Sequence, residues 1–285
     1  MKAPAGDPLV TVGIALYNHE RYIVECVESI IHQRYSPVEL IILDDGSNDD
    51  SLSTLRAFLD KVDTDPDKIT INLQTQSNQG MCNTLNTIAK SARGKYISFI
   101  GSDDIWMPDK LVDQVDFLEK HPDITLVHSN SVKINAEGEE LKKIDYSAKD
   151  NSGLLFEALV KRTGGINTPS HLYRRNIYEE IGYYDPDYSF EDTDFWLRLT
   201  REHTVGFIDK IHTGYRWHGK NLSKSDNALK FYNEELISIY EKNIQDPQLK
   251  RIAIRKIYRK SIVKALKTGS FRQALQYAHR CYQLR

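Results

Sequence analysis

The sequence lacks a long apolar run. No stretch reaches the roughly eighteen residues that a membrane-spanning helix requires. The N-terminal residues Met1 to Pro4 also lack the charged segment and following apolar stretch of a secretory signal. We therefore expect a protein that resides in the cytoplasm and does not cross a membrane.

Cysteine is scarce. The three cysteines, Cys26, Cys82 and Cys281, are widely spaced, and no C-x-x-C pair occurs. An odd number at such spacing argues against a disulfide framework and against a thiolate metal site. We expect ordinary buried thiols.

Acidic residues are missing from one region of the chain. Residues 247–285 contain 11 Lys and Arg and no Asp or Glu, whereas residues 1–246 carry a charge of −13 within a net charge of −2. The C-terminal segment is therefore a separate electrostatic unit.

Apolar runs in the first hundred residues alternate between strand-like and helix-like patterns. Residues 10–16 and 39–43 are typical of strands buried on both faces, and residues 22–32 between them have helical spacing. The alternation continues with a helix at 50–62, a strand at 69–74, a helix at 81–92 and a strand at 95–100. This order predicts a doubly wound, mostly parallel α/β sheet with helices on both faces.

The pattern changes after Asp104. A helix at 109–121, a strand at 126–129 and a hairpin turn at 135–138 indicate mixed α and β structure. From residue 227 onward the pattern predicts only helices. Their apolar stripes are Ile254, Ile257, Ile262 and Leu266 in one helix and Phe271, Leu275, Ala278 and Tyr282 in the next.

Polar residues follow each of the first four predicted strands, at the edge where open α/β sheets bind ligands. The four segments are Tyr17 to Glu20, Asp44 to Ser47, Asn78 to Gly80, and Ser102 to Asp104. Two carboxylate pairs at one crevice would repel an anion unless a cation lies between them. Hard oxygen ligands suit Mg²⁺ or Mn²⁺, so the pattern predicts a site for a metal-bound diphosphate.

A purely structural interpretation also fits each motif alone. Asp44-Asp45-Gly46-Ser47 is a good turn and helix N-cap sequence, and short motifs match by accident. The joint placement of the motifs at successive strand ends favours the functional interpretation.

The motif order resembles that of family 2 inverting glycosyltransferases of the GT-A fold. The resemblance covers roughly residues 8–225 and rests on motifs throughout that range. They are Tyr17-Asn18, Asp44-Asp45-Gly46-Ser47, Asn78-Gln79-Gly80, Ser102-Asp103-Asp104, Met107-Pro108 and Glu191-Asp192.

The resemblance implies a UDP-sugar donor and a set of nucleotide-binding residues. Asp44 occupies the position that hydrogen-bonds the uracil edge, with Tyr17 beside the base and Glu20 near the ribose. Further nucleotide-binding residues implied are Asn18, Asn78, Gly80, Asp103, Arg216 and Lys220.

The metal site implied is the Ser102-Asp103-Asp104 segment. The first aspartate would touch the ribose and the second would bind Mn²⁺ or Mg²⁺. Because Ser replaces the first Asp of the family's D-x-D pattern, only one strong ligand remains, and we expect His218 to supply another.

The resemblance also implies a catalytic base in the Glu191-Asp192 pair. Inversion is a single in-line displacement, so a carboxylate must take the acceptor proton as its oxygen attacks. We assign this role to Asp192, with Glu191 as the alternative. A helix cap at the same place is the structural alternative.

Two further segments carry weaker signals. Residues 215–223 resemble the family's Arg-x-His segment near a loop that closes over the donor, where Arg216, His218 and Lys220 would stabilise the leaving diphosphate. Residues 164–171 lie where the family places acceptor-facing residues, although two glycines also simply make a loop.

The basic C-terminal helices suit an anionic membrane surface or a pyrophosphate-linked lipid acceptor. The alternatives are a solvated face on a hairpin that packs on the catalytic domain, or one that pairs two subunits as a homodimer. We do not expect nucleic acid as a partner.

These observations predict a metal-dependent inverting glycosyltransferase in which residues 1–225 form a GT-A domain. A nucleotide half would span about 8–104, an acceptor half about 105–225, and a basic helical extension 226–285. The acceptor would be a saccharide or a lipid-linked saccharide, as in cell-surface polysaccharide synthesis.

Two rival functions were considered. A nucleotidyltransferase usually has a glycine-rich basic loop after the first strand, where this chain has Tyr17 to Glu20. A non-catalytic scaffold or sugar-nucleotide-binding module would have little reason to retain Asp44, Asp104 and Asp192 together, although fold resemblance alone does not establish activity.

Overall fold

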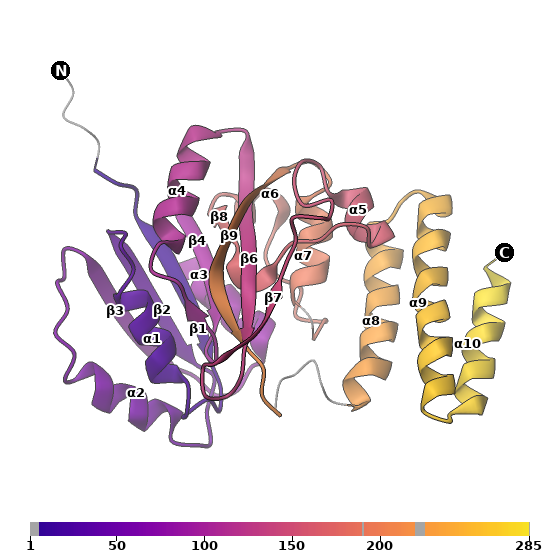
Figure 1. Ribbon diagram of the computed structural model, residues 1–285, viewed down its shortest axis with the longest axis horizontal. Helices are drawn as coiled ribbons and strands as arrows, with labels where there is room; N and C mark the ends of the chain where they lie inside the picture. The colour runs from indigo at the N-terminus through magenta and orange to yellow at the C-terminus, as the bar shows by residue number, and fades with distance from the viewer. Residues whose placement is uncertain (1–5, 190, 220–225, 285) are drawn as a thin grey trace.

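The structure is a computed structural model that describes residues 6–189, 191–219 and 226–284. Within these residues nine strands form one sheet in the order β3-β2-β1-β4-β8-β6-β9-β5, and β7 pairs with β6 at its side. No helix in the described part of the chain is both long and apolar enough to cross a bilayer. Figure 1 shows the sheet with helices packed around it and three long helices beyond one end.

The N-terminal half of the sheet is parallel throughout. Its strands are β1 (Val10–Leu16), β2 (Val38–Asp44), β3 (Ile69–Thr75) and β4 (Tyr96–Gly101). In this register Leu16 lies opposite Asp44, and Ala15 opposite Gly101, so the carboxyl ends of β1, β2 and β4 are level. The residues that follow these strands therefore meet at one edge.

Helices cover both faces of this parallel half. They are α1 (Ile23–Ile31), α2 (Ser51–Leu59), α3 (Met81–Ser91) and, from the next segment, α4 (Lys110–Lys120). The buried apolar side chains of α1, α2 and α4 belong to one core cluster and those of α3 to another. The predicted doubly wound arrangement is confirmed.

The second half of the sheet is mixed. Its strands are β5 (Ile105–Trp106), β6 (Ile124–Ile134), β7 (Glu140–Ile144), β8 (Leu172–Arg174) and β9 (Thr204–Arg216). The short helices around them are α5 (Phe156–Lys161), the 3₁₀ turn η1 (Thr168–Ser170), α6 (Ile177–Ile181) and α7 (Glu191–Leu199). Since β8 is antiparallel to both β4 and β6, and β9 is parallel to β6, β9 ends at the same edge as β4.

Strand β6 is longer than the predicted 126–129. It pairs with β9 along its whole length, and its polar residues 128–131 are buried. The tight turn at Asn135 to Gly138 is as predicted: the Asn135 amide donates to Glu139, and the Gly138 amide to Asn135. Apolar periodicity underestimates the strand because its central residues are polar.

The C-terminal part is entirely helical. Helices α8 (Asp226–Asn243), α9 (Pro247–Lys267) and α10 (Phe271–Gln283) stand side by side, with α10 outermost (Figure 1). Side chains of α8 and α9 share a third core cluster with Val160 of α5 and Leu197 of α7. This cluster attaches the extension to the second half of the sheet.

The predicted apolar stripes of α9 and α10 are partly wrong. In α9, Ile254 and Ile257 are buried as expected, but Leu266 is exposed. In α10 the predicted stripe faces outward, with Phe271 and Leu275 about two-thirds or more exposed. The side chains that pack on the third cluster are Tyr277 and Cys281 of α10 and Leu284 directly after it. The exposed stripe gave the stronger periodic signal, although it does not make the contact.

Candidate active site

Asp44 is buried at the carboxyl end of β2. Its side chain accepts a hydrogen bond from the Ser47 amide at 3.3 Å through Oδ2. Its other oxygen, Oδ1, is buried and has no hydrogen-bond partner among the described residues. A buried carboxylate oxygen without a donor is costly, so this atom is suited to a ligand N–H.

The carboxylate of Asp45, the next residue, is hydrogen-bonded within the protein. Its carboxylate accepts from the Gln76 side chain and from the amides of Gln79 and Gly80, all between 2.8 and 2.9 Å. Two carboxylate pairs facing one crevice were expected, but Asp45 instead holds the loop before α3. Gly80 has a positive φ of 83° and contributes its amide to this loop, while Asn78 is exposed.

The segment after β1 is held against the loop that precedes α2. Asn18 adopts a left-handed conformation, with φ 55°, and exchanges hydrogen bonds with Ser47 and Asn48. Glu20 accepts from the amide of Asp50, the residue before α2, at 2.9 Å. The ribose contact expected of Glu20 stays a prediction. Tyr17 is exposed at 42% and is available to a base placed beside it.

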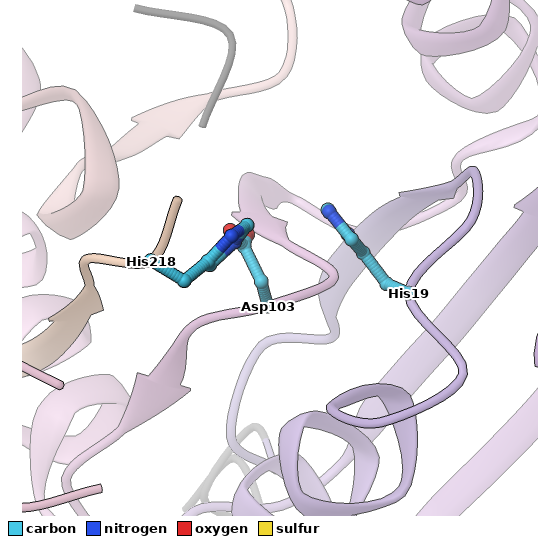
Figure 2. A group of neighbouring side chains, drawn as sticks. All are labelled: His19, Asp103 and His218. Atoms are coloured by element: carbon cyan, nitrogen blue, oxygen red, sulfur yellow. The ribbon is translucent and has the colours of Figure 1, made fainter. Parts of the chain in front are cut away.

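His19, Asp103 and His218 form one group of potential metal ligands. One ligand atom from each lies within 4.8 Å of the others. The His218 Nε2 lies 3.0 Å from Asp103 Oδ2, and the His19 Nδ1 lies 2.7 Å from the Ser102 hydroxyl. Figure 2 shows the His218 ring against the Asp103 carboxylate, with the His19 ring on the other side.

His19 lies within the Tyr17 to Glu20 segment, but the sequence motifs predict no role for it. The signal that could have identified it is its position three residues after the end of β1, at the edge where ligands were expected. The expectation for His218 was a site shared with Asp104. In the structure His218 instead contacts Asp103.

Asp104 is buried beside this group. Its Oδ1 accepts from the Arg216 amide at 2.7 Å. Burial and the neighbouring Asp103 carboxylate raise the pKa of Asp104 well above its usual range. A bound cation would relieve both effects, because opposite charge favours the ionised carboxylate.

Arg216 is fully buried and faces inward. Its guanidinium donates to the Asp103 carbonyl at 2.7 Å, to the Glu25 carboxylate at 2.6 Å, and to two carbonyls of the β6–β7 turn. A diphosphate contact was expected from its sequence position. The geometry instead makes Arg216 a positioning residue that fixes the backbone of the Asp103-Asp104 segment. Lys220 lies outside the described residues.

Asp192 lies in the first turn of α7, away from the parallel strands. Its Oδ2 accepts from the Thr168 hydroxyl at 2.9 Å and its Oδ1 from the Thr193 hydroxyl at 3.1 Å. It lines a cavity of about 190 Å³ together with Thr168, Trp196 and Tyr240. The side chain of Glu191 lies outside the described part of the structure. Thr168 was not singled out from the sequence, because its contact spans 24 residues.

Strand β9 connects the two groups. Thr213 on this strand donates to the Pro169 carbonyl at 3.1 Å, next to the residue that holds Asp192. Three residues further along, Arg216 reaches the Asp103-Asp104 segment. One strand therefore contacts both the η1 turn and the metal-ligand group.

The model of the family described as "Glycosyl transferase family 2" matches residues 11–182. An uncharacterized glycosyltransferase of Rickettsia felis is 29% identical over 87% of this chain and 39% of its own length. The chondroitin synthase of Escherichia coli is 28% identical over 80% of this chain and 33% of its own. The chain thus spans between a third and two-fifths of these two relatives.

Solved structures share the fold. Residues 1–349 of Staphylococcus aureus TarS, in complex with UDP-GlcNAc, superpose with a TM-score of 0.68 at 17% identity, covering 96% of this chain and 81% of that one. The mannosyltransferase PcManGT of Pyrobaculum calidifontis, in complex with GDP-Man and Mn²⁺, gives 0.61 at 18% identity, with 98% and 81% covered.

Proposed function

This chain belongs to glycosyl transferase family 2, and we propose that it is a metal-dependent inverting enzyme that moves a sugar from a UDP-sugar to an acceptor hydroxyl. One observation carries the proposal: His19, Asp103 and His218 converge at the carboxyl edge of the sheet. The GT-A fold and glycosyltransferase activity follow from the family; the donor, metal and stereochemistry are our inferences.

The donor base is recognised by Asp44. Uracil presents an N3–H group, and the unpartnered Oδ1 of Asp44 is an acceptor for it. Tyr17, exposed after β1, would stack on the base, with Asn18, Asn78 and Gly80 in the loops around it. That the TarS structure holds UDP-GlcNAc supports a uridine donor at this fold position.

The donor set fits a divalent metal. Two imidazoles and a carboxylate are close enough to share one ion. The pKa of the buried Asp104 carboxyl next to them is raised despite the nearby Arg216 guanidinium, and a cation would favour its ionised form. His19, Asp103 and His218 would hold the ion, with Asp104 as a further ligand. Imidazole ligands suit first-row transition metals, so of the two expected metals we propose Mn²⁺ rather than Mg²⁺. When bound, the metal neutralises charge on the donor diphosphate.

Asp192 would act as the catalytic base. As the acceptor oxygen bonds to the anomeric carbon, the bond from that carbon to the diphosphate oxygen breaks, and its electron pair leaves with UDP. The acceptor proton passes to Asp192, whose two oxygens are oriented by Thr168 and Thr193. Glu191 remains the alternative base.

The acceptor side is assigned to the second half of the sheet and the helical extension. We infer a nucleotide half at about 8–104, an acceptor half at about 105–225 and an extension at 226–285. A saccharide or lipid-linked saccharide acceptor agrees with the similarity to a chondroitin synthase. The basic helices of residues 247–285 would bring the enzyme to the inner face of a membrane.

The test is calorimetric binding of UDP-, GDP- and CDP-sugars with Mn²⁺ or with chelator. We expect one UDP-sugar to bind only when Mn²⁺ is present. In Asp103→Asn and Asp104→Asn, Mn²⁺ should no longer support this binding. Asp123→Asn is the matched control, since this exposed carboxylate precedes β6 at the opposite edge of the sheet. If no nucleotide-sugar binds under any metal condition, the proposal is wrong.

A further inference from the structure

Two hollows meet at one arginine. The cavity that contains Asp192 is also lined by Arg162. Arg162 in turn lines a second hollow, a groove of about 630 Å³ along α9. The other residues of this groove are Lys256, Arg259, Lys260, Val263, Lys264 and Lys267. All of the residues that line the groove except Val263 are Lys or Arg, and the groove shares Arg162 with the cavity that contains Asp192.

The six basic side chains of the groove lack a paired carboxylate in the described part of the chain. None of them forms an ion pair with another described residue. Residues 247–285 contain no Asp or Glu. Closely spaced cations repel one another, so a groove of this kind is stabilised by an anion.

The position of Arg162 is fixed by its surroundings. It follows the last residue of α5 in a left-handed conformation, with φ 53°, where glycine is the usual residue. The Lys256 ammonium donates to the Lys161 carbonyl and so ties α9 to the end of α5. Val160 packs into the cluster shared with Ile254 and Ile257. The two helices therefore hold Arg162 between cavity and groove.

The cavity combines oxygen atoms with an aromatic wall. Asp192 and Thr168 line it with a carboxylate and a hydroxyl, and Trp196 lines it with an indole ring that is 5% exposed. A sugar has hydroxyl groups for the first two side chains and apolar C–H faces for the ring.

We propose that the groove binds the phosphate groups of an anionic acceptor, so that the sugar attached to them enters the cavity and presents its hydroxyl to Asp192. The inference rests on the proposed function and names the substrate class of its acceptor side. Arg and Lys match phosphate oxygens in charge and geometry. Arg162 lies where the phosphate and sugar portions join.

The first experiment measures binding of inorganic tripolyphosphate to the full chain. A chelator is present, so that the proposed metal-dependent donor site does not contribute to the measured binding. Arg259→Glu/Lys260→Glu should weaken binding at least about tenfold at low salt, because two attractive charges become repulsive. The matched control is Arg272→Glu/Arg280→Glu, an equal charge change on exposed positions of α10 outside the groove. It should change affinity by about twofold at most.

The second arm separates a lipid surface from an acceptor site. Both double variants are tested on phosphatidylcholine vesicles with and without phosphatidylglycerol. One result would overturn the inference. In it, both double variants lose vesicle binding equally, and Arg259→Glu/Lys260→Glu leaves tripolyphosphate binding unchanged. The basic helices would then be a general membrane-contacting surface.

A third arm tests the link to the cavity. Glucose 1-phosphate should bind more tightly than inorganic phosphate. Trp196→Phe should reduce that difference, because the cavity loses part of its aromatic wall, and should leave phosphate binding unchanged. Equal affinity for both ligands would overturn the inference. Hydrolysis of the donor without acceptor reports separately on the proposed function: it should be unchanged in both double variants, and its absence in the wild type would count against the function alone.

Discussion

Asp44 and Asp192 are the two carboxylates assigned to substrates, and the chain places them by different means. Asp44 ends a strand whose register with β1 is continuous over seven residue pairs. Asp192 depends on Thr168, on the first turn of α7, and on Tyr240 across the cavity. The donor edge is built by neighbouring β-α-β units, whereas the acceptor cavity is assembled from segments far apart in the sequence.

Each region also has its own anchoring arginine. Arg216 joins β9 to the Asp103-Asp104 segment. Arg198 on α7 donates to Asp194 at 2.8 Å and to the carbonyls of residues 181–183. Both arginines satisfy several backbone carbonyls at once. Although β9 contacts both regions, each region has an arginine of its own, so we expect substitutions of the two arginines to have separable effects.

The largest expected effect is a loss of transfer without a loss of donor binding, which would separate the acceptor cavity from the donor edge. Asp192→Asn should lower transfer about a thousandfold, because a general base contributes roughly 10² to 10⁴ in rate, while the Kd for the UDP-sugar stays unchanged. Steady-state transfer and calorimetric donor binding measure the two quantities. Asp187→Asn, an exposed carboxylate in the preceding loop, is the control. Loss of donor binding in Asp192→Asn would show that the two regions are not separate.

Replacement of either anchoring arginine by methionine should have the next largest effect. Arg216→Met should lower the free energy of unfolding by about 3 kcal/mol, since buried carbonyls lose their donor, and should weaken Mn²⁺-dependent donor binding. Arg198→Met should cost a similar amount by urea denaturation yet leave donor binding intact. If both variants weaken donor binding equally, the donor and acceptor regions do not depend on separate arginines.

A smaller effect is expected within the donor edge. Asp44→Asn should weaken UDP binding by about 2 kcal/mol, or about thirtyfold, because an acceptor for the uracil N3–H is replaced by an amide. The amide can donate to the N3 of cytosine, which carries no hydrogen. The ratio of UDP to CDP affinity should therefore narrow, and an unchanged ratio would remove Asp44 from base recognition.

The last comparison distinguishes the regions by the pH dependence of their stability. Burial lowers the pKa of His128 from 6.5 to about 4 and that of His171 to about 3. The His128 Nε2–H donates to the Asn151 carbonyl, and Nδ1 accepts from the Asn167 amide, next to Thr168. Because the folded pKa lies below the unfolded one, the stability from neutral His128 is complete above about pH 6.5 and is lost as the pH falls toward 4.

The measurement is urea denaturation between pH 7 and 4.5. Each buried histidine should contribute a slope of about 1.4 kcal/mol per pH unit across that window. His128→Gln keeps one donor and one acceptor without titrating, so its slope should be smaller than that of the wild type. Identical slopes for the wild type and His128→Gln would mean that His128, which contacts Asn167 before η1, does not control the stability in acid.

The same contrast explains how much the sequence predicts. The first three β-α-β units and the edge where Asp44 and Asp103 lie follow from apolar periodicity, because each depends on adjacent segments. His19 joining His218, and Arg216 turning inward, depend on β9 reaching the end of β4. Periodicity carries no information on such pairing. It also misassigned the packing face of α10, where exposed apolar residues outnumber the buried ones.

The three proposed metal ligands follow β1, β4 and β9, and His218 lies 115 residues from Asp103 along the chain. An ion bound there would act as a removable cross-link that closes most of the domain into one loop. By mass action it would stabilise the folded chain by about 2.7 kcal/mol at a hundred times its Kd. The melting temperature would then report the free Mn²⁺ concentration, and a chain cut before β9 would lose that dependence.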